Sequence, residues 1–139
     1  CGSIGSAHCQ SITQHSKKSR IHSVFDLNSR LAEKLSKKYG VEVKYNINDV
    51  KKDHDIDIAL ICVPNDYHKS VSEQMAESKK HIMLEVPISN TISDAKEIIQ
   101  VCNKNKVKLT LNYSKRYLPH ISRAKEIFES GTIASLKLK

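Results

Sequence analysis

The sequence predicts an α/β fold, a doubly wound parallel sheet with helices on both of its faces. Strand-like apolar runs alternate with helical segments along most of the 139 residues, as in parallel sheets joined by crossover helices. The run 56–63 is apolar on both faces, which is expected of a strand at the sheet's centre. Near the start, Gly2 and Gly5 match the last two glycines of a G-x-G-x-x-G turn. The first glycine would precede Cys1, so the sheet is expected to be truncated at its first strand.

The expected elements follow a regular order. A helix over 3–14 precedes a strand over 21–25, a helix over 28–38, a strand over 41–45 and a short polar turn around 48–53. The central strand 56–63 ends at Pro64 and is followed by a helix over 67–78, a strand over 81–84, a helix over 93–103 and a strand over 107–111. Thr91 and Asp94 form a capping-box pattern. Pro119 opens the last helix, Gly131 suits a left-handed cap after it, and a strand-like pattern follows at 136–138.

The glycine turn and Asp26 together predict a dinucleotide site. Asp26 ends a strand about 20 positions after Gly5, the spacing typical of the carboxylate that holds the adenosine ribose hydroxyls. Without a Cβ, Gly2 lets the backbone approach a pyrophosphate and Gly5 lets the helix and a strand pack closely, while the helix N-terminus favours phosphate. A carboxylate repels a 2′-phosphate, so NAD is favoured over NADP, although Arg30 can moderate that preference. Taken alone, the same residues also fit an ordinary strand-turn-helix corner.

Composition excludes several other classes of protein. The net charge is +8, but the lysines are scattered in pairs and the aromatic content is 5% with no Trp, so no nucleic-acid partner is expected. No apolar run approaches the ~20 residues that cross a bilayer, so no membrane association is expected. The four cysteines show no C-x-x-C spacing, which favours a reducing cytoplasm. The acidic cluster around His54 is typical of a solvated turn, so no metal is expected.

Polar residues follow three successive strands, at the edge of the sheet where such folds bind ligands. They are Pro64-Asn65-Asp66-Tyr67-His68, Glu85-Val86-Pro87 and Asn112-Tyr113-Ser114-Lys115-Arg116. With these loops, the chain resembles the N-terminal cofactor domain of the Gfo/Idh/MocA oxidoreductases, the family of glucose-fructose oxidoreductase and inositol dehydrogenase. The resemblance covers nearly the whole chain. It depends on Gly2-Ser3-Ile4-Gly5 with His8, on Asp26, on Pro64-Asn65-x-x-His68, on Glu85-x-Pro87, and on Arg116 with Pro119.

The resemblance implies a Rossmann-type NAD(P)-binding domain over 1–118, with 119–139 forming a connecting helix and the start of a C-terminal substrate domain that is otherwise missing. It implies hydride transfer between NAD(P) and a hydroxyl or carbonyl of a sugar or polyol, and a homo-oligomer in the full-length protein. Ile4 and Asp26 would contact the phosphates and the adenosine ribose, and Glu85 would lie beside the nicotinamide ribose. The implied cofactor-binding residues are Gly2, Ser3, Ile4, Gly5, Asp26, Cys62, Val63, Pro64, Asn65, His68, Glu85, Asn112 and Arg116.

One residue departs from the family pattern. Val86 stands where the family's Glu-Lys-Pro motif has the lysine that would bind the reacting hydroxyl, so no catalytic residue is assigned in this chain. Two alternatives stay open: another group supplies the proton, or the protein is a non-catalytic dinucleotide-binding sensor or pseudoenzyme. The acid-base histidine of the family belongs to the missing domain, so this chain alone is expected to be catalytically incomplete. A methyltransferase is a third reading, which the Glu85-x-Pro87 loop and the lack of an antiparallel edge strand disfavour.

Overall fold

The computed structural model describes residues 1–131 and contains five strands, which pair only in parallel. They form two separate sheets. The first sheet consists of β1 (Ser23–Phe25) and β2 (Glu42–Lys44), and the second has the order β3 (Ile58–Ile61), β4 (His81–Leu84) and β5 (Leu109–Leu111). Parallel pairs need crossover connections, and a helix lies between each strand and the next along the chain. The predicted α/β class is therefore confirmed.

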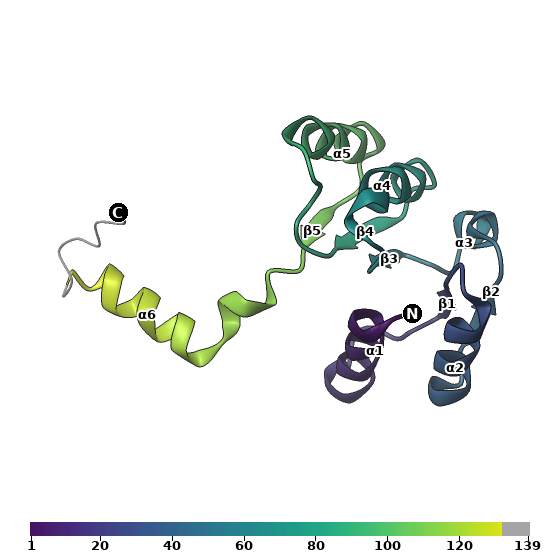
Figure 1. Ribbon diagram of the computed structural model, residues 1–139, viewed down its shortest axis with the longest axis horizontal. Coiled ribbons are helices and arrows are strands. Elements are labelled where there is room, and N and C mark those ends of the chain that lie inside the picture. The colour runs from purple at the N-terminus through teal and green to yellow at the C-terminus, as the bar shows by residue number, and fades with distance from the viewer. Residues whose placement is uncertain (132–139) are drawn as a thin grey trace.

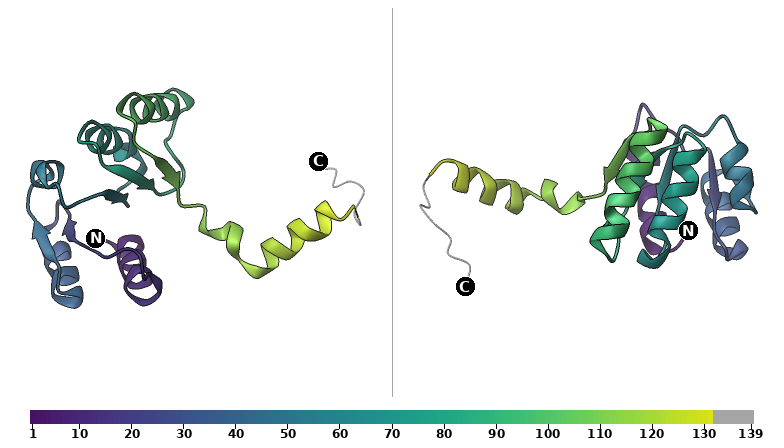
Figure 2. Two further views of the ribbon diagram at one scale, coloured as in Figure 1. Left: turned by 180° about the vertical axis from the view of Figure 1, so that it is seen from behind. Right: turned by 90° about the horizontal axis from the view of Figure 1, so that it is seen from above.

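The helices cover both sides of the strands (Figure 1). On one side lie α1 (Ser3–His15) and α2 (Ser29–Tyr39), and on the other α4 (His68–Glu77) and α5 (Ile92–Asn105). Two short 3₁₀ turns, η1 (Asn65–Tyr67) and η2 (Ser114–Tyr117), begin the segments that follow β3 and β5. The last helix, α6 (Pro119–Glu129), leads away from the rest of the molecule (Figure 2). No helix within residues 1–131 is long and apolar enough to cross a membrane.

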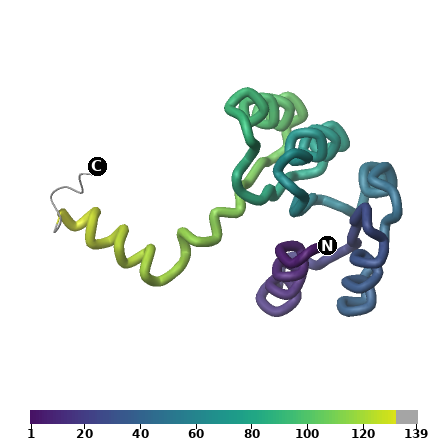
Figure 3. Tube along the Cα trace, viewed as in Figure 1, coloured from purple at the N-terminus to yellow at the C-terminus, as the bar shows by residue number. Residues whose placement is uncertain are grey.

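The break between the two sheets corrects one expectation. The run around β3 was expected at the centre of the sheet, but within the described residues β3 pairs only with β4, and β1 pairs only with β2. Ile58 at the start of β3 is consequently 57% exposed. Helix α1 contacts both parts: Cys9 packs in the cluster of β1 and α2, and a Cβ built on Gly5 would lie 3.9 Å from the Cβ of Cys62 after β3. The Cα trace shows this path from α1 to β1 (Figure 3).

Each part has its own apolar cluster. The larger joins the second sheet to α4 and α5, and its buried members are Ile61, Met75, Ala76, Ile82, Leu84, Ile98, Cys102 and Val107. The smaller joins β1 to α1 and α2 through Cys9, Val24, Ala32 and Leu35. In α4 and α5 the buried residues recur every three or four positions, so each helix turns one face to the strands. These two clusters hold the strand ends, and hence the loops beyond them, in place.

Most helices begin and end close to the predicted positions, and the structure corrects the prediction for one segment. The segment expected as a polar turn around 48–53 is a helix, α3 (Ile47–Lys52), because the Asn46 side chain accepts a hydrogen bond from the Asn48 N–H and caps it. The capping residue Thr91 is confirmed, since its hydroxyl oxygen accepts from the Asp94 N–H at 3.1 Å. Gly131 has a φ of 72°, as expected of a left-handed cap after α6. The predicted strand at 136–138 lies outside the described residues.

Candidate functional site

The loops singled out in the sequence leave the strands at their carboxyl ends. Because the strands of each sheet run parallel, the residues that follow β3, β4 and β5 emerge at one edge: Cys62, Glu85 and Asn112. The register places the last residue of β3 beside the last residue of β4, and that residue beside the last of β5. In folds of this class that edge is where ligands bind.

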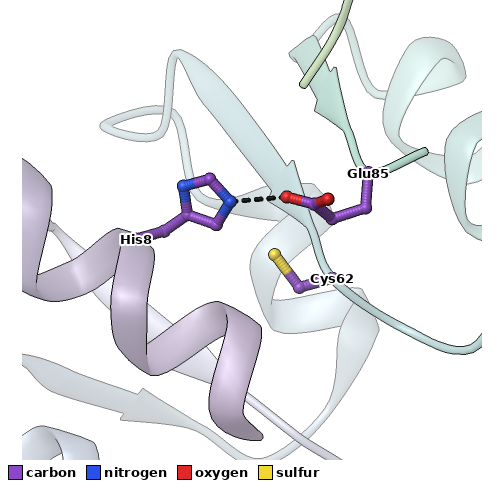
Figure 4. Close-up of side chains that lie close together, drawn as sticks. All are labelled: His8, Cys62 and Glu85. Carbon is purple, nitrogen blue, oxygen red and sulfur yellow. Dashed lines mark hydrogen bonds and ion pairs between the residues drawn. The ribbon is translucent and has the colours of Figure 1, made fainter. Parts of the chain in front are cut away.

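Three polar side chains meet at this edge, and we call them the His8 cluster: His8, Glu85 and Asn112. His8 Nε2 lies 2.5 Å from Glu85 Oε1, and Asn112 Nδ2 donates to the same oxygen at 2.5 Å. His8 projects from α1 toward Glu85, with Cys62 close to both (Figure 4). The His8 and Glu85 side chains are 18% and 17% exposed, so the cluster is accessible from solvent. It joins α1 to the ends of two strands of the second sheet.

The electrostatics of the cluster favour a charged carboxylate beside a neutral thiol. Partial burial by itself would raise the pKa of Glu85, but hydrogen bonds from His8 and Asn112 favour the ionised form and leave the pKa below its usual value. Burial and the neighbouring Glu85 charge raise the pKa of Cys62 to about 11. Glu85 is therefore an ionised hydrogen-bond acceptor at neutral pH, while Cys62 is mainly a protonated thiol.

Asp26 lies at the end of β1, where the sequence predicted it. Its Oδ1 accepts a hydrogen bond from the Asn28 N–H at 2.9 Å. A carboxylate that remains partly exposed is ionised at neutral pH. The carboxylate is thus charged, accessible at 21% of its side-chain surface, and positioned to accept from donors.

The glycine turn opens toward solvent. A Cβ built on Gly2 would meet nothing within 4 Å, so the backbone before α1 can be approached closely. A Cβ built on Gly5 would lie 3.9 Å from the Cβ of Cys62, which is an ordinary contact, so the described residues themselves do not require glycine there. Ser3 is exposed and the side chain of Ile4 is 52% exposed at the start of α1. The turn therefore presents unobstructed first-turn backbone beside Asp26.

Comparison with known proteins agrees with this geometry. A family model described as "Oxidoreductase family, NAD-binding Rossmann fold", that of the Gfo/Idh/MocA proteins, matches residues 1–113. The chain belongs to this family. The chain is 30% identical over 137 residues to the uncharacterised oxidoreductase YrbE of Bacillus subtilis, covering 96% of this chain and 39% of that protein. It is 28% identical to the inositol 2-dehydrogenase of Rhizobium meliloti, covering 99% of this chain and 41% of that protein.

Solved structures give the same answer for the fold. A crystal structure from Desulfitobacterium hafniense, whose name gives NADPH-dependent oxidoreductase as a provisional activity, superposes with a TM-score of 0.88 at 30% identity. The alignment covers 95% of this chain and 38% of that one. The Gfo/Idh/MocA chain described here thus spans about two fifths of the length of the relatives that it matches.

The remaining predicted residues of this Gfo/Idh/MocA domain lie in different surroundings. Pro64 and Asn65 are exposed after β3, and Val63 is half-buried. Val86 is 37% exposed directly after Glu85, so an apolar side chain stands beside the cluster. Arg116 is exposed on η2, with its guanidinium 5.6 Å from the centroid of the Tyr117 ring. The structure gives Arg116 no hydrogen bond or ion pair to the His8 cluster.

His68 differs from all of these because it is fully buried. Its relative exposure is 0%, and both ring nitrogens face backbone carbonyls: Nδ1 lies 2.9 Å from the Pro87 oxygen and Nε2 lies 3.0 Å from the Val63 oxygen. The sequence suggested a side chain lining the cofactor's path. The structure instead places the His68 ring beneath the loops that follow β3 and β4, where it contacts their backbone carbonyl oxygens.

One further polar cluster had only a weak signal in the sequence. Asp53 Oδ2 lies 2.9 Å from Lys44 Nζ and 3.0 Å from His22 Nε2, while Lys44 also binds Glu42 at 2.8 Å. The buried Lys80 ammonium donates to the backbone oxygen of Asp53. His22, Glu42 and Asp53 are metal-ligating types brought close together, as are His8, Cys62 and Glu85. In the Asp53 group the Lys44 ammonium already binds both carboxylates, which makes it an ion-pair network. Only the alternation of Glu42 and Lys44 on one strand face hinted at it.

Proposed function

We propose that the polypeptide carrying this chain is an NAD(P)-dependent oxidoreductase that transfers hydride between the nicotinamide and a hydroxyl or carbonyl carbon of a sugar or polyol. This chain would supply the cofactor half of the site. The observation that carries the proposal is that an open glycine turn begins α1, the helix whose His8 bonds to Glu85, while the Asp26 carboxylate follows the neighbouring strand β1. The similarity to an inositol 2-dehydrogenase supports the substrate class.

The residues present fit a dinucleotide. Gly2 leaves room for a pyrophosphate against the first turn of α1, whose N–H groups and helix dipole favour negative charge. Asp26 accepts from the Asn28 N–H at the end of β1, and a carboxylate at this place in the fold can also accept from ribose hydroxyls. Glu85, ionised and partly exposed, would accept from a second ribose. The nicotinamide supplies the hydride chemistry when bound, and these residues of the chain orient it.

Within this proposal NAD is the preferred cofactor. The Asp26 carboxylate is ionised, and a 2′-phosphate placed against it would meet like-charge repulsion. Arg30 is exposed one turn into α2 and is the residue that could offset this repulsion. The Desulfitobacterium hafniense relative is named for NADPH, so the two cofactors need a direct comparison.

The first experiment is a calorimetric titration of the native polypeptide that carries this chain with NADH and with NADPH, alongside Asp26→Ala. We expect NADH to bind more tightly and Asp26→Ala to weaken it by about tenfold, as for the loss of a charged hydrogen-bond acceptor. NADPH affinity should fall less or rise. Arg30→Ala is the matched control, with little effect on NADH. A folded protein that binds neither nucleotide contradicts the proposal, whereas tighter NADPH binding contradicts only the cofactor preference.

A second candidate function is a non-catalytic dinucleotide-binding module, and Val86 is the observation that favours it. An exposed isopropyl group beside Glu85 offers no proton to a reacting hydroxyl. General acid-base groups typically contribute about 10²- to 10⁴-fold to rate. A sensor would therefore retain the cofactor site and lose turnover at this position.

Val86→Lys distinguishes the two functions. In a binding module that has lost its chemistry at Val86, Lys at this exposed position should create NAD-dependent oxidation of myo-inositol that the unaltered protein lacks, with NADH affinity unchanged. Val86→Met is the control for side-chain size. Turnover by the unaltered protein that Val86→Lys does not improve would mean that another group supplies the proton. No turnover in either form supports the binding module.

The division into a cofactor domain over 1–118 and a connecting segment over 119–139 stays a prediction that agrees with the family match ending at residue 113. Assembly into homo-oligomers also stays a prediction. The proposed location in a reducing cytoplasm stays a prediction as well.

A further inference from the structure

His68 links two loops that carry site residues. Its ring lies beneath them at 0% exposure, 2.9 Å from the Pro87 carbonyl oxygen on one side and 3.0 Å from the Val63 carbonyl oxygen on the other. Val63 belongs to the turn between β3 and η1, which continues into Asn65. Pro87 follows Glu85 and Val86 after β4. A single side chain thus bonds to the backbone of both loops.

These two contacts of the His68 ring have a chemical requirement. A carbonyl oxygen is an acceptor, so each ring nitrogen must carry a hydrogen to bond it, and a neutral imidazole has only one N–H. The doubly protonated ring satisfies both carbonyls, whereas the neutral ring leaves one of them facing a lone pair. Either form leaves no ring nitrogen to bind a ligand. His68 is therefore unable to contact cofactor or substrate and acts through the loops that it holds.

Few other hydrogen bonds hold these loops together beyond the ends of the strands, although Val63 and Ile88 pack on the larger core. The last backbone bond between them runs from the Glu85 N–H to the Ile61 oxygen at 3.1 Å. Further out, the Asn90 side chain donates to Asp66 at 2.6 Å, and both of these residues are exposed. Among the side-chain links that the described residues make here, His68 is the buried one. An exposed link exchanges readily with water, so His68 is the firmer constraint on the spacing of the loops.

We propose that His68 is a positioning residue for the nicotinamide end of the site. It sets the place of Glu85 and Val86 relative to the turn at Asn65 and has no part in holding the adenosine end. Asp26 and Gly2, which would hold that end, belong to β1 and α1 and share no bond with His68. The inference rests on the proposed function, because the two ends are defined by the orientation of a bound dinucleotide.

The test compares NADH with ADP, which lacks the nicotinamide riboside. In the native polypeptide that carries this chain, His68→Leu removes the hydrogen bonds of the ring at similar size and should weaken NADH by about tenfold while leaving ADP within about twofold. His68→Gln retains an amide donor and should recover part of the NADH affinity. Equal losses for both nucleotides, or no loss for either, overturn the proposal.

Two variants of the same helix serve as controls. Met75 is buried at 2% in the core and makes no hydrogen bond to either loop, so Met75→Ala measures the effect of general destabilisation of α4. Ser72, one turn after His68, is fully buried and its hydroxyl has no partner, so Ser72→Ala should change little. Neither control should alter the ratio of NADH to ADP affinity. If Met75→Ala reproduces the selective loss, the effect of His68 is general stability and the proposal fails.

Amide hydrogen exchange without nucleotide separates this proposal from the proposed function. His68→Leu should speed exchange in both 63–67 and 85–89, and leave β1 and α2 unchanged, when compared with Met75→Ala. Unchanged exchange in either loop overturns the positioning role. If the unaltered protein binds neither NADH nor ADP, the proposed function fails, and the exchange rates alone then decide whether His68 holds the two loops.

Discussion

The two sheets of this domain differ in how they are stabilised. The β3–β4–β5 part has a core of eight buried residues between its strands and helices α4 and α5. The β1–β2 part has four, and one of them, Cys9, belongs to α1. Within the described residues, the smaller part therefore depends on a helix that also contacts the larger part. The comparison teaches that the fold's stability is concentrated on one side, whereas the candidate site draws residues from both.

The His8 cluster joins the two parts through polar contacts. His8 extends from α1, which packs on the smaller part, and bonds to Glu85 at the end of β4 in the larger part. Asp26, which we propose for the adenosine side, follows β1, and the loops that we propose for the nicotinamide side follow β3 and β4. A dinucleotide bound as we propose would therefore contact both sheets, and its binding would stabilise their relative placement.

A leucine-to-alanine substitution in the core of each part should test the difference in stability most directly. Leu84 is 0% exposed in the larger core and Leu35 is 4% exposed in the smaller one. We expect Leu84→Ala to lower the free energy of unfolding by about 4 kcal/mol and Leu35→Ala by about 2 kcal/mol, because a cavity in a small cluster is more easily closed by relaxation. Urea unfolding followed by circular dichroism measures both. Equal losses, or a larger loss at Leu35, would show that stability is shared evenly.

The next expected effect is weaker and concerns pH: an ion pair in the β1–β2 part should make the stability of the fold depend on acidic pH. Hydrogen bonds from Lys44 and Asp55, and then from His22, hold the pKa of Asp53 well below its usual value of 3.8. A depressed carboxylate pKa stabilises the fold above the unfolded value, and that contribution is lost as the pH falls through the folded value. Asp53→Asn should therefore lower the urea midpoint at pH 7, with the difference shrinking below about pH 4.

Asp49→Asn is the control for that experiment. It removes one negative charge from the same region, at a carboxylate that makes no ion pair in the structure. Its urea midpoint should follow that of the unaltered protein at pH 7. A loss at Asp53→Asn that persists unchanged at pH 3 would assign the effect to packing instead of ionisation.

The sequence predicted the order and type of the elements because the apolar periodicity of each segment is local. It missed α3, since six residues are too few to show a helical period and their polar composition is typical of a turn. It also placed β3 at the centre of the sheet. Apolar residues on both faces report what a strand can pack against, and they do not identify the strands that pair with its edges.

Residues of the candidate site could be predicted from the sequence where a residue type at a given spacing has a single common role. Asp26 at a strand end and Glu85 in its motif are of this kind. The contacts that join them to the rest were not, because His8 lies 77 positions from Glu85 and 104 from Asn112. His68 was identified by its motif but not by its surroundings. Only the fold shows that its ring is buried against the backbone of two loops.

The smallest predicted effect concerns the thiol beside the His8 cluster. Burial first and the Glu85 charge second raise the pKa of Cys62 to about 11, so little thiolate exists at pH 8. Glu85→Gln removes that charge and should speed alkylation of Cys62 by iodoacetamide by about two- to threefold. Cys102, buried in α5, is the internal control within each sample and should keep its rate.

Peptide mapping by mass spectrometry after timed quenching would measure both rates in one experiment. The result bears directly on the two-part comparison, because the carboxylate that acts on Cys62 is the one that His8 binds from α1. If Glu85→Gln also loosened α1 from the second sheet, Cys9 of the smaller cluster would become reactive together with Cys62. Faster alkylation of Cys62 alone assigns the effect to charge, whereas joint acceleration assigns it to separation of the two parts. An unchanged or slower rate at Cys62 contradicts the electrostatic link between the two residues.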